Sequence, residues 1–236
     1  MKKLQKVFSL ILIILLLSAC TNKTLTAKEQ DALKFKEEYE SLNGKSSNNR
    51  KYRKVSIAED NPIRYQTAND IVKMIEDKKT FIVYFGFDSC PWCRSVVPTL
   101  LEVAKDLEVD TIYYVDVKEI RDVLKLGEND EVVQEKEGDP SYYKLLELLD
   151  PVLEKYTLTN DDKKEIDTEE KRIYAPNVIS VVEGKAVELE SGISDKQTDA
   201  YMKLTEEMKK DTYNKFKCSI KCVLESSTTC SNKNSC

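Results

Sequence analysis

Residues 81–98 read FIVYFGFDSCPWCRSVVP, and this stretch decides the expected fold class. The apolar run 81–87 is rich in β-branched and aromatic residues and is typical of a buried strand, whereas 94–107 has helical spacing. Cys90 and Cys93 therefore stand where a strand gives way to a helix, the usual place of a dithiol redox site. We expect an α/β protein built around this turn.

The spacing of the two cysteines suits redox chemistry, because one helical turn brings both sulfurs within reach of a single disulfide. Cys90 lies at the expected helix N-terminus, where unpaired N–H groups and the helix dipole favour a thiolate, so it is the predicted nucleophile. Cys93 lies one turn further in and is the predicted resolving thiol. Pro91 fits the first helical position, and Trp92 offers an apolar face to a docking peptide.

Other interpretations of the motif remain open. C-x-x-C could be half of a zinc site, although the chain has no histidine. A structural disulfide between Cys90 and Cys93 is a second alternative, but a bond across so short a loop is usually labile. Trp92 could instead pack on a neighbouring loop.

The stretch 81–98 resembles the active-site strand, motif and kinked helix of the thioredoxin superfamily, including the proline at position 98. A second stretch, RIYAPNVISVVEGK at 172–185, resembles the cis-proline, strand, turn and strand of the same superfamily. The resemblance implies that Pro176 is a cis-proline beside the sulfurs and that the backbone of Ala175 pairs with a substrate peptide. The alternative is an ordinary trans proline that begins a strand.

Two departures from thioredoxin bear on function. Tyr84 occupies the position where thioredoxin carries a buried aspartate that assists proton transfer. Asp88 is close to Cys90 in sequence, and its carboxylate would oppose thiolate formation unless it points to solvent. The sequence therefore leaves both the redox potential and the direction of the reaction open.

Residues 1–19 resemble a bacterial lipoprotein signal peptide. The lysine-rich start KKLQK at 2–6 precedes a wholly apolar run at 10–17, which ends in the lipobox-like LSAC at 17–20. The run is too short to span a bilayer comfortably, so we expect cleavage before Cys20 and lipidation of its thiol. The mature chain is then anchored by lipid to the outer face of the cell membrane.

The charge balance argues against a nucleic-acid partner, because the formal net charge is −5 and the predicted leader carries only basic charges. Residues 20–54 read as a tether, in which a charged helical patch at 28–42 precedes a Gly/Ser/Asn-rich stretch at 43–49. The alternative is a helix that packs on the domain. The residues that could line its apolar face are Ala32, Leu33, Phe35, Tyr39 and Leu42.

Residues 55–217 form the predicted thioredoxin-like domain, a mixed central sheet with helices on both faces. Strands are expected at 55–57, 80–87, 111–117, 177–182 and 186–189. Helices are expected at 68–76 after an N-cap at Thr67, at 91–107, and from about Asp195 after an N-cap at Ser194. The segment 118–172 reads as a mostly helical insertion with an apolar helical stretch at 142–156, either one wall of a substrate groove or a decoration.

Residues 218–236 read as a cysteine-rich tail that holds two structural disulfides. Its four cysteines are Cys218, Cys222, Cys230 and Cys236. Three pairings are possible, and the nested one, 218 to 236 and 222 to 230, suits a helix followed by a returning tail. Zinc binding by the four thiolates is the alternative.

The whole layout resembles the extracytoplasmic thioredoxin-like lipoproteins of Gram-positive bacteria, related to accessory thioredoxins associated with bacteriocin export. This resemblance implies a thiol–disulfide oxidoreductase that forms mixed disulfides with exported proteins, needs a redox partner protein and uses no cofactor. One alternative is a redox-silent peptide-binding or export accessory lipoprotein. Another is a surface lipoprotein with a structural dithiol, involved in adhesion.

Overall fold

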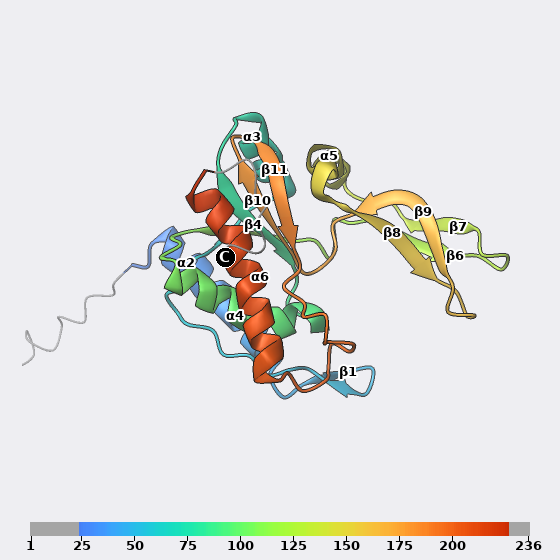
Figure 1. Cartoon of the computed structure of the whole chain (residues 1–236), viewed down its shortest axis with the longest axis horizontal. Helices are drawn as coiled ribbons and strands as arrows, with labels where there is room; N and C mark the ends of the chain where they lie inside the picture. The colour runs from blue at the N-terminus through green and yellow to red at the C-terminus, as the bar shows by residue number, and fades with distance from the viewer. Residues whose placement is uncertain (1–23, 227–236) are drawn as a thin grey trace, which may run out of the picture.

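Strand β4 (Phe81–Gly86) lies at the centre of a five-stranded sheet in the computed structural model, which describes residues 24–226 (Figure 1). The other strands are β3 (Ile63–Tyr65), β5 (Ile112–Asp116), β10 (Asn177–Val182) and β11 (Lys185–Glu190). The order across the sheet is β11-β10-β4-β5-β3. The strands β3, β5 and β4 are parallel, whereas β10 runs antiparallel to β4 and to β11, so the sheet is mixed as predicted.

Helices cover both faces of this sheet, which confirms the predicted α/β layering. On one face lie α2 (Ala27–Ser41), α4 (Pro91–Asp106) and α6 (Glu206–Leu224), and on the other lie α3 (Ala68–Glu76) and α5 (Pro140–Leu149). Side chains alternate along β4 accordingly: Tyr84 packs under α2 and α4, whereas Val83 and Phe85 pack under α3 and α5. Because both faces are covered, every residue of β4 is buried.

The predicted elements nearest the cysteines are confirmed within one or two residues at their ends. Helix α3 has the predicted bounds, because Thr67 and Asp70 form a capping box in which each side chain accepts the other's backbone N–H. The predicted strand at 55–57 is wrong. Val55 and Ile57 are buried in the core, but the first strand of the sheet begins at Ile63.

The predicted tether is also wrong over most of the part that the structure describes. The alternative, a helix that packs on the domain, is correct. Helix α2 begins at a capping box between Thr26 and Glu29, it packs Phe35 and Tyr39 against the sheet, and Ala32 on the same side is also buried. Because α2 contains many charged residues, its composition resembles that of a solvated segment. Its buried residues nevertheless recur at helical spacing. Residues 44–51 form a continuously exposed stretch, which includes the small hairpin of β1 (Ser46–Ser47) and β2 (Arg50–Lys51).

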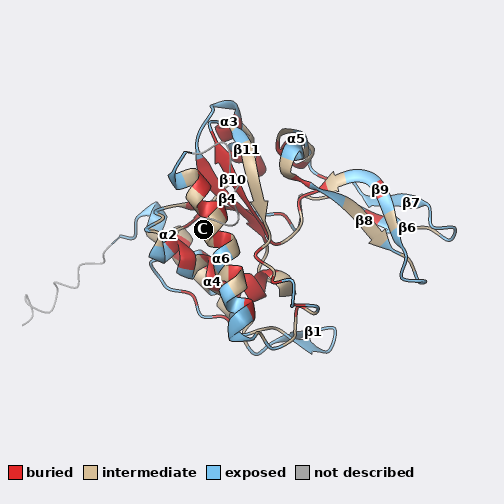
Figure 2. Cartoon of the chain, viewed as in Figure 1, coloured by how far each residue is buried: buried red, intermediate tan, exposed pale blue. Residues whose placement is uncertain are grey.

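The predicted mostly helical insertion at 118–172 is corrected to two β-hairpins around one helix. The first hairpin pairs β6 (Val123–Leu126) with β7 (Val132–Lys136), and the second pairs β8 (Glu154–Thr159) with β9 (Glu165–Arg172). Both hairpins project from the layered body and are largely exposed (Figures 1 and 2). In β9, which reads EIDTEEKR, the β-branched residues Ile166 and Thr168 alternate with acidic residues, a pattern that favours a strand.

Helix α5 between the hairpins is shorter than the predicted helical stretch at 142–156. It ends at Leu149, followed by the 3₁₀ turn η1 (Asp150–Val152), because Pro151 has no N–H to continue the helix. Tyr142, Leu145 and Leu149 are buried against the sheet, so this helix is part of the body rather than a decoration.

A buried ion pair closes the base of the hairpins. Arg172 donates from Nη1 to the Asp122 carboxylate at 2.9 Å and from Nη2 to the Asp122 carbonyl at 2.8 Å. The side chains are only 7% and 3% exposed, and the guanidinium lies 4.1 Å from the ring centroid of Tyr156. The hairpins therefore leave the body through a fixed base next to the loop that carries Ala175 and Pro176.

The last helix begins later than predicted. Ser194 and Asp195 lie in a turn region, and α6 starts after Thr205, whose side chain accepts the N–H of Met208. The predicted boundary between domain and tail at 217/218 falls inside this helix, so Cys218 and Cys222 belong to the body. Cys222 is disulfide-bonded, whereas Cys230 and Cys236 lie outside the described residues, so the pairing stays a prediction.

Between residues 24 and 226 no helix is long and apolar enough to cross a membrane. The predicted signal peptide and the lipidation site Cys20 lie outside the described residues.

The packing of α2 can be tested with Phe35→Ala. Phe35 is 0% exposed, so this truncation is expected to lower the free energy of unfolding by about 3–5 kcal/mol, measured by urea denaturation. Glu37→Ala, on the exposed side of the same helix, is the matched control and is expected to change stability by less than about 0.5 kcal/mol. Equal stability of the two variants would mean that α2 does not pack on the domain.

Candidate redox site

Cys90 is the N-cap residue of α4, the position that the sequence predicted for the nucleophile. Its backbone is extended (φ −72°, ψ 118°), and its sulfur accepts the backbone N–H of Cys93 at 3.3 Å. Pro91 follows at the start of the helix, where its missing N–H costs no hydrogen bond. The strand-to-helix turn therefore aims the free N–H groups of the helix at the Cys90 sulfur.

The loop before β10 faces this sulfur from the opposite side. The Ala175–Pro176 peptide bond is cis, as the resemblance implied, and the Cys90 thiol donates to the carbonyl oxygen of Ala175 at 3.2 Å. The side chain of Asn177 accepts the N–H of Tyr174 at 2.6 Å and fixes the loop. Antiparallel pairing of β10 with β4 brings these residues, distant in sequence, to the end of the strand that carries the cysteines.

The two cysteines have opposite electrostatic environments. The Cys93 thiol donates a hydrogen bond to the Cys90 sulfur, and this bond, together with the N–H groups of Cys93 and Trp92, lowers the pKa of Cys90 against the effect of its burial. Burial raises the pKa of Cys93, and its hydrogen bond to Cys90 raises it further. Cys90 is 3% exposed and Cys93 is 0% exposed, so electrostatics rather than exposure separates the two thiols.

Arg121 is a site residue that the sequence analysis missed. Its positive charge lowers the pKa of Cys90, and its guanidinium lies 5.2 Å from the ring centroid of Phe87, which immediately follows β4. Arg121 lies in the loop between β5 and β6, inside the segment that was interpreted as an insertion. No sequence motif marks Arg121, because its approach to Cys90 depends on the parallel pairing of β4 with β5.

Arg94, immediately after Cys93, anchors the cysteine helix. Its side chain is fully buried, and it donates to the carbonyl oxygens of Arg53, Tyr39 and Asp88 and to the side-chain oxygen of Asn43, at 2.8–3.1 Å. These acceptors come from the end of α2, from the segment after β2 and from the turn before Cys90. The first turn of α4 is thereby tied to the N-terminal part of the chain.

Trp92 and Tyr84 complete the surroundings of the dithiol. Trp92 is half-buried and packs against the core, and its predicted contact with a substrate peptide stays a prediction. Tyr84 is fully buried, hydrogen-bonds the Cys93 side chain and lies 2.8 Å, oxygen to oxygen, from the hydroxyl of Tyr39. Tyr39 was predicted only as a possible packing residue of α2.

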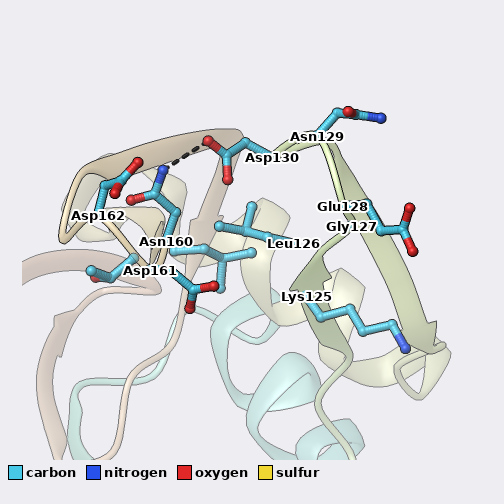
Figure 3. A pocket seen from close by; sticks show the side chains of 11 residues that line it. Lys125, Leu126, Gly127, Glu128, Asn129, Asp130, Asn160, Asp161 and Asp162 are labelled. Carbon is cyan, nitrogen blue, oxygen red and sulfur yellow. Dashed lines mark hydrogen bonds between the residues drawn. The ribbon is translucent and has the colours of Figure 1, made fainter.

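A separate cavity of about 810 Å³ lies between the tips of the two hairpins, lined by 125–130 and 158–162 (Figure 3). Asn160 donates to the Asp130 carboxylate at 2.7 Å and joins the two tips. The lining is polar and rich in carboxylates, and it includes none of the predicted site residues. We therefore place the candidate site at the dithiol rather than at this cavity.

No model of a known protein family matches the chain, and no curated protein is significantly similar to it.

The role of Arg121 can be tested with Arg121→Gln. Because the positive charge lowers the pKa of Cys90, its removal is expected to move the pH midpoint of Cys90 alkylation upward and to slow alkylation at neutral pH about two- to threefold. The measurement is the rate of iodoacetamide modification of Cys90 against pH, followed by mass spectrometry. Lys118→Gln, in the same loop, is the control variant, and an equal effect in both would exclude a specific role for Arg121.

Proposed function

We propose that this protein is a thiol–disulfide oxidoreductase with a thioredoxin-like fold. The order of the sheet, the cysteines at the N-terminus of α4 and the cis-proline opposite them support this assignment together. The single observation that carries it is the environment of the Cys90 sulfur. That sulfur lies between the N–H of Cys93 and the carbonyl of Ala175, with a lowered pKa, while the pKa of its neighbour Cys93 is raised.

These features suit a two-step exchange. The Cys90 thiolate attacks a substrate disulfide, one substrate sulfur leaves as a thiol, and the other remains bonded to Cys90 in a mixed disulfide. Cys93 then attacks the Cys90 sulfur and releases the second substrate thiol. The same steps in reverse transfer a disulfide to a substrate dithiol, so the direction depends on the potential of the redox partner protein.

The loop at Ala175 gives the substrate a place to bind. When Cys90 is a thiolate or part of a mixed disulfide, it no longer donates to the Ala175 carbonyl. That carbonyl is then available to accept an N–H from the backbone of a bound peptide, the pairing mode of an added strand. The accessible part of Trp92, two residues after Cys90, offers an apolar surface to the same peptide.

The predicted lipoprotein signal sets the proposed location. We infer that the protein acts outside the cytoplasm on exported proteins while lipid on Cys20 holds it at the membrane. An oxidising compartment agrees with the disulfide at Cys222.

The exchange mechanism can be tested by trapping. Cys93→Ser leaves the nucleophile but removes the resolving thiol, so covalent complexes with exported proteins are expected to accumulate and to disappear on reduction. Cys90→Ser is the matched control and is expected to form none. Complexes are counted on non-reducing gels and identified by mass spectrometry. If neither variant forms complexes and both retain wild-type function in cells, the redox-silent binding protein is the better interpretation.

The lipid anchor has a separate test. Full-length chain expressed with labelled palmitate is expected to become labelled, and Cys20→Ala is expected to abolish the label and to leave the leader uncleaved. Labelling that persists in Cys20→Ala would contradict lipidation at this position without affecting the redox assignment.

A further inference from the structure

The cysteine helix rests on a pair of buried tyrosine hydroxyls. Tyr84 comes from the central strand β4 and Tyr39 from the N-terminal helix α2, both are 0% exposed, and their oxygens lie 2.8 Å apart. Both rings are held by neighbouring aromatic residues: Tyr39 lies 4.5 Å from Phe35 between centroids, and Tyr84 stacks on Tyr114 at 5.4 Å. The two hydroxyls are therefore fixed in place by packing from three elements.

The position of the Tyr84 hydroxyl depends on Gly86. A Cβ atom at Gly86 would lie 2.2 Å from the Tyr84 oxygen, so any other residue there would displace the hydroxyl. Gly86 is also the last residue of β4, four positions before Cys90. The missing side chain of Gly86 in β4 thus leaves a space that the Tyr84 hydroxyl fills.

From this space Tyr84 hydrogen-bonds the side chain of Cys93. The pKa of Cys93 is influenced by the side chains of Cys90 and Tyr84 and by the backbone N–H of Phe87. Tyr39 and Tyr114 belong to the same buried cluster and are neutral when protonated. Burial raises the pKa values of Tyr84 and Tyr39 well above their ordinary value, so both hydroxyls remain protonated. They can therefore donate hydrogen bonds, but neither is a phenolate that could act as a base.

The direction of the hydrogen bonds follows from the number of protons. Each hydroxyl has one proton, so when Cys93 is a thiolate the arrangement that satisfies every group is Tyr39 O–H to Tyr84, and Tyr84 O–H to the Cys93 sulfur. Hydrogen bonds in such a chain strengthen one another in a buried environment. The contact is therefore stronger for the thiolate than for the thiol.

We propose that Tyr84, oriented by Tyr39, is the side-chain hydrogen-bond donor that activates Cys93 for the resolving step. This inference rests on the proposed oxidoreductase function. In that step the Cys93 sulfur bonds to the Cys90 sulfur and the bond from Cys90 to the substrate sulfur breaks. The electron pair of the broken bond and the proton lost by Cys93 both end on the departing substrate thiol.

The test separates the two steps of exchange in the full-length chain. Reduced protein is mixed with oxidised glutathione, and the glutathione adduct on Cys90 is followed by acid quenching and mass spectrometry as it forms and then resolves. In Tyr84→Phe we expect adduct formation at the wild-type rate and resolution about tenfold slower, the loss of one hydrogen bond to a charged group. The pH midpoint of resolution is expected to move upward in the same variant.

Tyr114→Phe is the matched control, because the Tyr114 hydroxyl is buried in the same cluster without a hydrogen-bond partner in the described part of the chain. It is expected to resolve at the wild-type rate. Tyr39→Phe is expected to slow resolution of the adduct by a smaller factor than Tyr84→Phe. If Tyr84→Phe does not fold, the resolution rate of Tyr39→Phe tests the proposal instead. Equal resolution rates in all variants would overturn the role of Tyr84 alone, whereas absence of any adduct in the wild type would overturn the oxidoreductase function as well.

Discussion

The buried guanidinium of Arg94 is the constraint on which the arrangement of the site depends. A fully buried charge requires hydrogen-bond partners, and Arg94 finds them in backbone carbonyls and one amide rather than in a carboxylate. The end of α2 and the segment around Arg53 must therefore lie against the first turn of α4. Removing these partners would leave the charge unsatisfied directly beside Cys93.

The same packing explains why the two thiols differ although both are buried. Cys90 lies at the helix N-terminus with N–H donors, the thiol of Cys93 and the charge of Arg121 directed at it. Cys93 lies inside the core among tyrosines, where burial favours its neutral form. One helical turn therefore separates a sulfur stabilised as a thiolate from one that needs a specific donor to ionise.

The sequence was sufficient for the parts of the fold in which local signals agree. The run 81–98, the capping box at Thr67 and the stretch 172–185 placed the central strands, α3, α4 and the loop with Pro176. These segments combine unambiguous hydrophobic patterns with turn and cap residues that have few alternative structures.

The failures come from segments whose structure is determined by distant contacts. Helix α2 has the composition of a charged tether, and only the packing of Phe35 and Tyr39 against the sheet shows that it belongs to the domain. The hairpins after β5 are rich in charged residues, so their sequence resembles that of a solvated helix. Arg121 reaches Cys90 only through the pairing of two parallel strands, and Tyr39 reaches Tyr84 from an element 45 residues away. No local pattern could have placed either residue in the site.

The most direct test of the account is the redox equilibrium of the Cys90–Cys93 pair in the full-length chain. The protein is equilibrated in glutathione buffers of graded ratio, and thiol trapping with peptide mapping follows these two cysteines alone. We expect a reversible two-electron transition between dithiol and disulfide, with a midpoint between about −120 and −270 mV. A pair that remains in one state across all glutathione ratios would contradict the assignment of this site as a redox centre.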